Sequence, residues 1–423
     1  MNILIISNIE LDTKNASGNT YANWLSDWSE IKIACIYCRE THPNNEFCNE
    51  YFSVSPFCII KNVFKPWRIG RHFYNNIVSH CETIVGGSES KIIQKSKHSD
   101  RRFYYLVNDL LYKSKIWMNK RYKEFIGSFN PDIVFFFAKS DAFIEENLKY
   151  IRKHTSAKCV AFYADDVYRR FQNNEGLIYR IFERRFPKVV NLADFHFGAS
   201  HLMCEDYGKL FNIPMLPLYK GCEISQTKDS VNVPIRIVYA GNLYYGREKT
   251  LFKIVDAIKE VNKAEVKILL EIYTSAEITE NIDKKLNIPN ASEIMGPKPY
   301  EDIIKIMHEA DIVLHVESFL DKNIESVRLS YSTKISDCLQ SGSMLLAIGP
   351  RDIASIEEAI VIPGAYVVSE EQKIDSAIED IVACKAEIPN RAKLINDYAK
   401  EHFPISIVRE NLKKTFYTLI ERR

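Results

Sequence analysis

The sequence has no apolar run that approaches the roughly 18 residues needed to cross a bilayer as a helix. Its first residues, Met-Asn-Ile-Leu-Ile-Ile-Ser, are apolar over only four consecutive positions and lack a basic leader. This pattern indicates a first strand rather than a signal peptide. We therefore expect a cytoplasmic chain, unless a surface segment attaches it to the inner face of the plasma membrane.

The sequence also has almost no net charge and no complete metal-binding motif. Its 56 basic and 55 acidic residues leave a formal charge of +1, which gives no general case for nucleic-acid binding. Cys35 lies in the apolar run Ile31–Tyr37 and Cys38 directly follows it; side chains three positions apart on a strand point to opposite faces. No second cysteine pair or histidine pair accompanies them, so we expect reduced thiols and no bound metal.

Short apolar segments alternate with longer amphipathic ones along the 423 residues. The predicted strands are Asn2–Ile6, Ile31–Tyr37, Asp132–Phe137, Cys159–Tyr163, Phe195–Ala199, Ile235–Ala240, Val266–Tyr273, Ile312–Val316 and Met344–Ile348. The predicted helices are Thr20–Trp28, Ala142–His154, His201–Phe211, Lys249–Asn262, Tyr300–Glu309, Thr333–Ser341 and Ile405–Ile420. Buried β-branched strands that alternate with helices favour parallel sheets covered on both faces.

This alternation is interrupted once, around Pro214–Pro234, where prolines and a polar run replace it. We predict a hinge there, between two doubly wound α/β domains that face each other across a cleft. The first domain would span residues 1–215 and the second residues 216–403. The amphipathic C-terminal helix, 404–423, is expected to be able to pack back on the first domain.

The segment Ser-Tyr-Ser-Thr-Lys-Ile-Ser-Asp-Cys-Leu-Gln-Ser-Gly, residues 330–342, begins a helix with several hydroxyls and the cation Lys334. One hydroxyl is enough for a cap, and a cation in a first turn opposes the helix dipole. A bound anion at this end would explain both features. The alternative is an ordinary capped helix with a solvent-exposed lysine.

A second segment has the same character. The strand Ile235–Ala240 runs into Gly-Asn-Leu-Tyr-Tyr-Gly-Arg-Glu-Lys-Thr, residues 241–250. Its glycines allow close approach of a ligand, and Arg247 and Lys249 lie at the strand-to-helix junction. In open parallel sheets ligands bind outside the carboxyl ends of the strands, so both segments would lie on one side of the sheet. The alternative is that these are two surface cations.

Taken together, these motifs resemble the GT-B glycosyltransferases, in particular the retaining enzymes of glycosyltransferase family 4. The resemblance is carried by the motifs Tyr-Ala-Gly-Asn-Leu, Met-Gly-Pro-Lys-Pro-Tyr-Glu-Asp (295–302), Glu317-Ser-Phe, Ser-Thr-Lys-Ile-Ser-Asp, Ala-Ser-Gly-Asn-Thr (16–20), Ala-Asp-Phe-His-Phe-Gly-Ala-Ser (193–200) and Lys-Gly-Cys-Glu (220–223). It covers most of the chain, is strongest from 193 to 350 and is weakest between 40 and 130. It implies two Rossmann-like domains, of which the second binds a nucleotide diphosphate-sugar.

The resemblance also implies roles for single residues. Arg247 and Lys249 would hold the donor diphosphate and offset the charge of the leaving group, and Glu317 would contact the transferred sugar. The donor-binding set would be Gly241, Asn242, Arg247, Lys249, Lys298, Ser332, Thr333, Lys334 and Asp337, with Asp337 on the ribose and Lys298 beside the base. The sequence departs from the family pattern at Asn242, where a basic residue is common, and by an insertion at Leu320–Leu329.

On the acceptor side the sequence offers fewer candidates. Asp165 and Asp166 follow the strand Cys159–Tyr163, and one of them could orient or deprotonate an acceptor hydroxyl. The alternative is a helix cap with a solvated neighbour. Ser17 and Gly18, in the loop expected after the first strand, could line the same cleft.

One segment is strongly basic. Residues 95–125 contain nine basic and three acidic residues, interleaved with aromatic side chains, and Phe-Lys-Pro-Trp-Arg-Ile-Gly-Arg-His-Phe (64–73) adds further cations. Such segments can rest on anionic lipid. The alternative is a helix that simply buries its aromatic residues.

We therefore expect a retaining, metal-independent glycosyltransferase without a cofactor. It would move a sugar from a nucleotide diphosphate-sugar to a saccharide acceptor, which we expect to be lipid-linked, in the synthesis of a bacterial surface polysaccharide such as O-antigen or capsule. A nucleotide-sugar epimerase of the same architecture and a non-catalytic sugar-nucleotide sensor or scaffold remain as alternatives.

Overall fold

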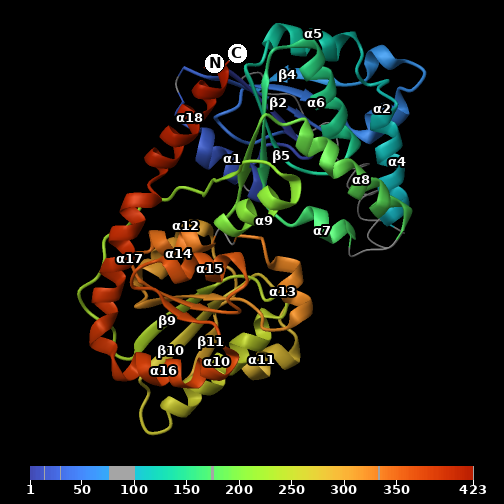
Figure 1. Cartoon of the computed structure of the whole chain (residues 1–423). Coiled ribbons are helices and arrows are strands. Elements are labelled where there is room, and N and C mark those ends of the chain that lie inside the picture. The colour runs from blue at the N-terminus through green and yellow to red at the C-terminus, as the bar shows by residue number, and fades with distance from the viewer. Residues whose placement is uncertain (14, 29, 76–100, 173–175, 332–333, 423) are drawn as a thin grey trace. The chain divides into compact units, whose positions relative to one another are not determined.

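The computed structural model describes residues 1–13, 15–28, 30–75, 101–172, 176–331 and 334–422 (Figure 1). The chain divides into two compact units. Unit 1 comprises Met1–Gly198, Cys204–Leu216 and Arg409–Arg423, and unit 2 comprises Ala199–Met203 and Pro217–Val408. Each unit is built on its own, mainly parallel sheet, as the sequence predicts.

The sheet of unit 1 has the strand order β4-β3-β2-β1-β5-β6-β7-β8 within the described residues. Its strands are β1 (Asn2–Ser7), β2 (Lys32–Tyr37), β3 (Glu50–Ser53), β4 (Arg71–Tyr74), β5 (Ile133–Phe137), β6 (Lys158–Tyr163), β7 (Phe195–Gly198) and β8 (Leu216–Pro217). The pairs from β3 to β7 are parallel, and β4 runs antiparallel to β3. Runs such as Ile3–Ile6 are buried on both faces, as expected of a covered parallel sheet.

The following helices belong wholly or partly to unit 1. They are α1 (Ala16–Leu25), α2 (Pro56–Lys61), η1 (Pro66–Arg68), α4 (Arg101–Lys113), α5 (Lys120–Phe129), α6 (Ala142–His154), α7 (Val167–Gln172), α8 (Leu177–Asn191), α9 (His201–Phe211) and α18 (Ile405–Glu421). From Arg409 onward α18 is part of unit 1, where the Phe416 ring lies 5.5 Å from that of Phe135. Arg409 Nε donates to the Asn23 carbonyl at 2.7 Å, which ties α18 to α1.

The sheet of unit 2 has the order β11-β10-β9-β12-β13-β14 within the described residues, and all its strand pairs are parallel. Its strands are β9 (Ile235–Ala240), β10 (Ile268–Tyr273), β11 (Ser292–Ile294), β12 (Ile312–Val316), β13 (Met344–Ile348) and β14 (Tyr366–Val368). This is the classical doubly wound order, which reverses direction between β9 and β12. The carboxyl ends of these two strands therefore mark the expected ligand position.

The helices of unit 2 cover this sheet. They are α10 (Arg247–Val261), α11 (Glu280–Leu286), α12 (Tyr300–Glu309), α13 (Asp321–Val327), α14 (Lys334–Gln340), α15 (Ala354–Val361), η3 (Glu371–Lys373), α16 (Ile374–Ala383), η4 (Lys385–Glu387) and α17 (Ile388–His402). The segment Leu320–Leu329, which the family resemblance marks as an insertion, contains α13.

The first helix begins earlier than the sequence predicts. It spans Ala16–Leu25 rather than Thr20–Trp28, because the Asn15 side chain caps it by accepting from the Gly18 amide at 2.7 Å. Ser17 and Gly18 therefore lie in a helical first turn and not in a loop, which corrects the prediction. A Cβ at Gly18 would lie 2.1 Å from the Asp12 carbonyl oxygen, so this glycine permits close packing of the chain on itself.

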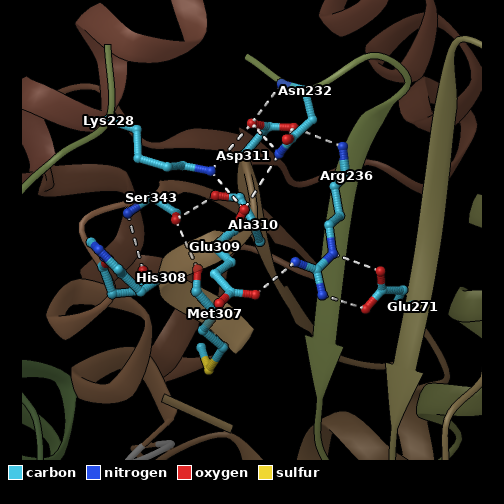
Figure 2. Close-up of polar contacts among 11 residues, drawn as sticks. Lys228, Asn232, Arg236, Glu271, Met307, His308, Glu309, Ala310, Asp311 and Ser343 are labelled. Atoms are coloured by element: carbon cyan, nitrogen blue, oxygen red, sulfur yellow. Dashed lines mark hydrogen bonds and ion pairs between the residues drawn. The ribbon is translucent and has the colours of Figure 1, made fainter. Parts of the chain in front are cut away.

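At the amino ends of β9 and β12, a polar cluster holds the preceding linker to the sheet (Figure 2). One carboxylate oxygen of Asp311 accepts from the Arg236 amide at 2.8 Å, and the other accepts from the Asn232 amide at 3.1 Å. Arg236 pairs with Glu271 through two contacts of 2.6 and 2.9 Å. Because this cluster lies at the amino ends of the strands, it is structural and separate from the carboxyl-end site described below.

Candidate functional site

The loop after β9 brings its backbone close to other elements of unit 2. Gly241 follows the strand, and Gly246, with φ +75°, precedes α10. A Cβ at Gly241 would lie 2.2 Å from Lys334 Nζ, and one at Gly246 would lie 2.3 Å from Asn323 Nδ2. Both positions thus require a residue without a side chain, Gly246 also because of its left-handed backbone.

Arg247 and Glu317 meet at the carboxyl ends of β9 and β12. Arg247 Nη2 lies 2.9 Å from Glu317 Oε1, and its Nε lies 3.1 Å from Oε2. Nη1 of the same arginine donates to the Asn242 side chain at 2.8 Å. Burial lowers the pKa of Arg247, but the charge and hydrogen bonds of Glu317 outweigh it and leave the pKa raised. The guanidinium is therefore charged and held in one place.

Glu317 itself is 2% exposed and is fixed from several sides. Its carbonyl accepts from the Thr250 hydroxyl at 3.0 Å, and its amide donates to the Ile348 carbonyl at 2.8 Å. Nε2 of His315 lies 3.5 Å from Glu317 Oε1 and 3.0 Å from the Ser355 hydroxyl. Burial, followed by the charges of Arg247 and Lys334, lowers the pKa of His315 to about 3, so this imidazole is neutral at physiological pH.

Lys334 is the first residue of α14 and reaches over the loop after β9. Its Nζ lies 5.7 Å from the centre of the Tyr239 ring, a cation–π distance. Burial, followed by the charge of Arg247, lowers the pKa of Lys334 to about 8, although Glu317 acts in the opposite direction. Since Glu317 is already paired with Arg247, the second cation, Lys334, leaves a net positive charge that suits a phosphate group.

Asp337, in the first turn of α14, takes part in a separate contact. Its Oδ1 accepts from the Tyr300 hydroxyl at 2.8 Å and lies 3.7 Å from Lys220 Nζ. Lys220 Nζ also lies 5.3 Å from the centre of the Tyr300 ring. Asp337 is therefore held in place, with its second carboxylate oxygen in none of these contacts.

The remaining donor-side candidates are more exposed. Lys249 lies in the first turn of α10, and no carboxylate of a described residue lies within 4 Å of its Nζ. Lys298 is exposed in the turn between β11 and α12. Ser332 and Thr333 lie outside the described residues. Arg247 and Lys334 are thus the two candidates that the structure brings together with Glu317, Gly241 and Asn242.

In unit 1, the acceptor-side candidates lie after β6 and in α1. Asp166 Oδ1 accepts from the Arg169 amide at 3.2 Å and from the Tyr207 hydroxyl at 2.8 Å, and Oδ2 lies 3.1 Å from Arg169 Nη1. This carboxylate therefore caps α7, which is the alternative that the sequence leaves open. Asp165 is exposed.

Two negative findings concern the described residues alone. Across them, we find no group of three or more histidine, cysteine or acidic side chains arranged to hold a metal ion. Similarly, none of the helices described is both long and apolar enough to cross a membrane.

The basic segment 95–125 divides between the core and the surface. Trp117, Tyr122 and Phe125 are buried, as an ordinary packed helix would have them. Phe103, in α4, is exposed, and so is Trp67 in the earlier basic segment. Residues 95–100 lie outside the described residues.

Sequence reasoning missed three side chains beside the candidate residues, namely His315, Tyr300 and Lys220. His315 carried a signal, because it is the one polar residue within the apolar strand Ile312–Val316. Tyr300 and Lys220 lie in motifs that carry the resemblance, but no role was expected of them, since their proximity to Asp337 depends on how α12 and the linker fold over α14.

No family model matches the sequence, and no curated protein matches it. Solved structures do match it along its whole length. Sucrose-phosphate synthase from Thermosynechococcus elongatus is 10% identical, with a TM-score of 0.63 and 100% of both chains covered. HepE from Anabaena, in complex with UDP, is 11% identical, with a TM-score of 0.61, covering 99% of this chain and 100% of that one.

A third match is an α,α-trehalose-phosphate synthase (UDP-forming) from Burkholderia xenovorans in complex with glucose-6-phosphate. It is 9% identical, with a TM-score of 0.58, and covers 99% of this chain and 100% of the other. At such low identity the similarity shows the fold and not the activity. The two parallel-sheet α/β units therefore form the GT-B fold, which confirms the fold predicted from the sequence.

Proposed function

We propose that the protein is a glycosyltransferase that uses a nucleotide diphosphate-sugar. The observation that carries this proposal is the placement of Arg247 and Lys334 around Gly241, at the point where the strand order of unit 2 reverses. Two cations and a backbone without a side chain suit a diphosphate. The UDP bound to the HepE structure, which shares the fold, makes UDP the first nucleotide to test.

In the proposed reaction, the bond between the anomeric carbon and the diphosphate oxygen breaks. The diphosphate leaves with the bonding electrons, and an acceptor hydroxyl oxygen forms the new bond and gives up its proton. Arg247, Lys334 and Lys249 would stabilise the negative charge that develops on the leaving group. These cations would take the part that a metal ion plays elsewhere, so we propose that the reaction needs neither metal nor cofactor.

Glu317 is proposed to position the transferred sugar rather than to attack it. The carboxylate is already engaged at both oxygens by Arg247, which lowers its nucleophilicity and fixes its orientation. Retention of anomeric configuration belongs to the proposal through the resemblance to glycosyltransferase family 4. Asp337 would accept from the ribose, Lys298 would lie beside the base, and backbone N–H groups around Thr333 and Lys334 would contact the phosphates.

On the acceptor side, we propose a saccharide, lipid-linked and part of a growing bacterial surface polysaccharide such as O-antigen or capsule. Asp165 or Asp166 would orient or deprotonate its hydroxyl, and Ser17 and Gly18 would line its site. Support comes from the exposed apolar and basic surface of unit 1. The glucose-6-phosphate in the trehalose-phosphate synthase structure is a soluble acceptor candidate that should be tested beside it.

The test is binding and turnover with the full-length chain. Thermal-shift measurements with UDP, GDP, ADP and CDP should show stabilisation by one of them, because a ligand that binds only the folded state raises its stability. Lys334→Met should abolish the shift, whereas Lys259→Ala, an exposed lysine later in α10, should retain it. No shift with any nucleoside diphosphate would contradict the proposed function.

Turnover then separates the alternatives. Transfer of the sugar that depends on an added acceptor pool supports a glycosyltransferase and should persist in EDTA. Conversion of the donor sugar without acceptor would indicate an epimerase, and binding without turnover on any acceptor would indicate a sensor or scaffold.

A further inference from the structure

Unit 1 exposes several large apolar side chains in or next to α2, η1 and α4, and α2 and α4 contact each other. We call this the α2–α4 surface and define it by Ile60, Val63, Phe64, Trp67, Phe103 and Leu110. Phe64 is 91% exposed, Phe103 71%, Leu110 69% and Trp67 60%. Single exposed apolar residues are ordinary, but a group of this kind on packed neighbouring helices indicates an interaction site.

The two helices also enclose an apolar groove. It has a volume of about 250 Å³ and is lined by Ile59 and Val63 on one side and Val107, Leu110 and Leu111 on the other. Figure 1 shows α2 and α4 side by side. Two of the exposed side chains that define the surface, Val63 and Leu110, line this groove.

The outward orientation of α4 is fixed by charges on its inner face. Arg185, which is buried, pairs with Asp109 of α4, and its Nε lies 2.9 Å from Glu145 Oε2. Lys113 of α4 lies 2.9 Å from both Glu145 and Glu146. Turning α4 to bury Phe103 and Leu110 would break these buried ion pairs, so their exposure is built into the fold.

The segment that carries Ile60, Val63, Phe64 and Trp67 has charged side chains of one sign only. Lys61, Lys65, Arg68 and Arg71 are all exposed, and residues 51–81 contain no acidic residue. Among the described residues, no carboxylate lies within 4 Å of Lys61, Lys65 or Arg68. These cations are therefore available to an anionic partner.

We infer that the α2–α4 surface binds the face of a bilayer that contains anionic lipids. Apolar side chains flanked by cations match a membrane interface, where aromatic residues insert and lysine and arginine meet lipid phosphates. A second copy of the chain fits less well, because it would bring two sets of four cations together. The inference rests on the proposed function in one respect: binding to a bilayer would bring the protein to the lipid-linked acceptor proposed above.

This inference narrows the surface expected from the sequence. Within 95–125, Trp117 and Tyr122 belong to the core and are not available to lipid. The residues that would insert come from the shorter segment 60–67 and from the outer face of α4. Substitutions in those two places, rather than across the whole basic segment, should therefore abolish binding.

The chain has an internal probe for the test. Of its four tryptophans, Trp24, Trp28 and Trp117 are buried and Trp67 is exposed. With vesicles of phosphatidylcholine and phosphatidylglycerol, we expect the Trp67 emission to shift to shorter wavelength and the protein to co-sediment. Pure phosphatidylcholine, or salt of about 1 M, should reduce binding at least about tenfold.

Variants separate the contributions. Phe64→Ser with Leu110→Ser, and separately Lys65→Glu with Arg68→Glu, should each reduce binding about tenfold or more while circular dichroism and nucleotide binding are unchanged. Trp67→Phe should remove the emission shift but retain co-sedimentation. Lys259→Glu with Lys263→Glu, a matched pair of exposed lysines in unit 2, should have no effect.

Three results would overturn the inference. The first is equal binding to neutral and anionic vesicles. The second is the absence of binding to either kind of vesicle at low salt. The third is a Trp67 that acrylamide cannot quench in the absence of lipid, since the surface would then be covered by a second copy or by another part of the chain; light scattering distinguishes these two. Failure of nucleotide binding with normal vesicle binding would contradict the proposed function and leave this inference standing.

Discussion

Arg247 and Glu317, which are 70 positions apart in the sequence, contact each other through two nitrogen–oxygen pairs of 2.9 and 3.1 Å. The contact joins the start of α10 to the end of β12 at the reversal point of the sheet. It holds a cation, whose third nitrogen is 2.8 Å from Asn242, where a diphosphate is proposed to bind. Geometry and charge at this contact underlie the predictions below.

Breaking this pair on one side should destabilise unit 2. Glu317→Ala or Arg247→Met each leaves a largely buried charge without its partner, which typically costs about 3–5 kcal/mol. The double variant should cost less than the sum, with a coupling energy of about 0.5–3 kcal/mol. Urea unfolding of the four proteins measures this cycle, and additive costs would show that the pair does not interact.

Lys249→Ala should lower turnover by about 100- to 1000-fold, because a preorganised positive group that faces the leaving group is worth about 2.7–4 kcal/mol. The fold should be unaffected, since Lys249 is exposed and its side chain makes no contact with a described carboxylate. Turnover at saturating donor measures the effect, with Lys259→Ala as the control. Near-normal turnover in Lys249→Ala would refute its role at the leaving group.

Gly241→Ala should weaken nucleotide binding and also lower stability, because the buried Tyr239 ring must shift to admit the Cβ. The added Cβ would lie 2.2 Å from Lys334 Nζ and 2.7 Å from the Tyr239 hydroxyl. The flexible end of the lysine can move away at small cost, but it then leaves the proposed phosphate position. We expect at least about a tenfold loss of affinity by calorimetry, equal to about 1.4 kcal/mol. Unchanged affinity would mean that Lys334 does not need to lie over Gly241.

Nucleotide affinity should fall as the pH rises through about 8, where Lys334 loses its proton. Lys334→Arg should remove this dependence, because arginine keeps its charge across that range. Calorimetric titrations between pH 7 and pH 9.5 measure this pH dependence, because that range extends about one unit to either side of the Lys334 pKa. An equally steep fall in Lys334→Arg would assign the titration to another group.

The same pKa shift has a consequence for stability in the absence of ligand. The folded-state pKa of Lys334 is depressed below its unfolded value, so between about pH 8 and the unfolded lysine pKa of about 10.4 the unfolded chain binds more protons. The contribution of Lys334 to stability should therefore rise with pH across that window. Unfolding midpoints of the wild type and of Lys334→Met, compared across this pH window, isolate the contribution of Lys334. A contribution that falls as the pH rises would contradict the burial of this cation.

Much of unit 2 could be predicted because its central strands are self-contained patterns. The structure reproduces three mainly apolar runs residue for residue, namely Ile235–Ala240, Ile312–Val316 and Met344–Ile348. The short edge strand β14 escaped prediction, since its three residues depend on pairing with β13. The helices α16 and α17 were also missed. The cap at Asn15 shifted α1 because one side-chain contact outweighed the apolar pattern.

The candidate site could be predicted in its positions but not in its contacts. The rule that ligands bind at the carboxyl ends of parallel strands was enough to associate Arg247 with the start of α14. It could not show that Arg247 contacts Glu317, or that His315 and Ser355 lie behind that carboxylate. Such contacts depend on strand order, and the reversal between β9 and β12 emerges only when the sheet is assembled.

The most direct test is a crystal structure of the protein soaked with the nucleoside diphosphate that gives the largest thermal shift. We predict that its phosphates lie within hydrogen-bond distance of Lys334 Nζ and of the Gly241 backbone, with Arg247 adjacent. A nucleotide bound elsewhere in either unit, or electron density that shows none at this position, would contradict the account.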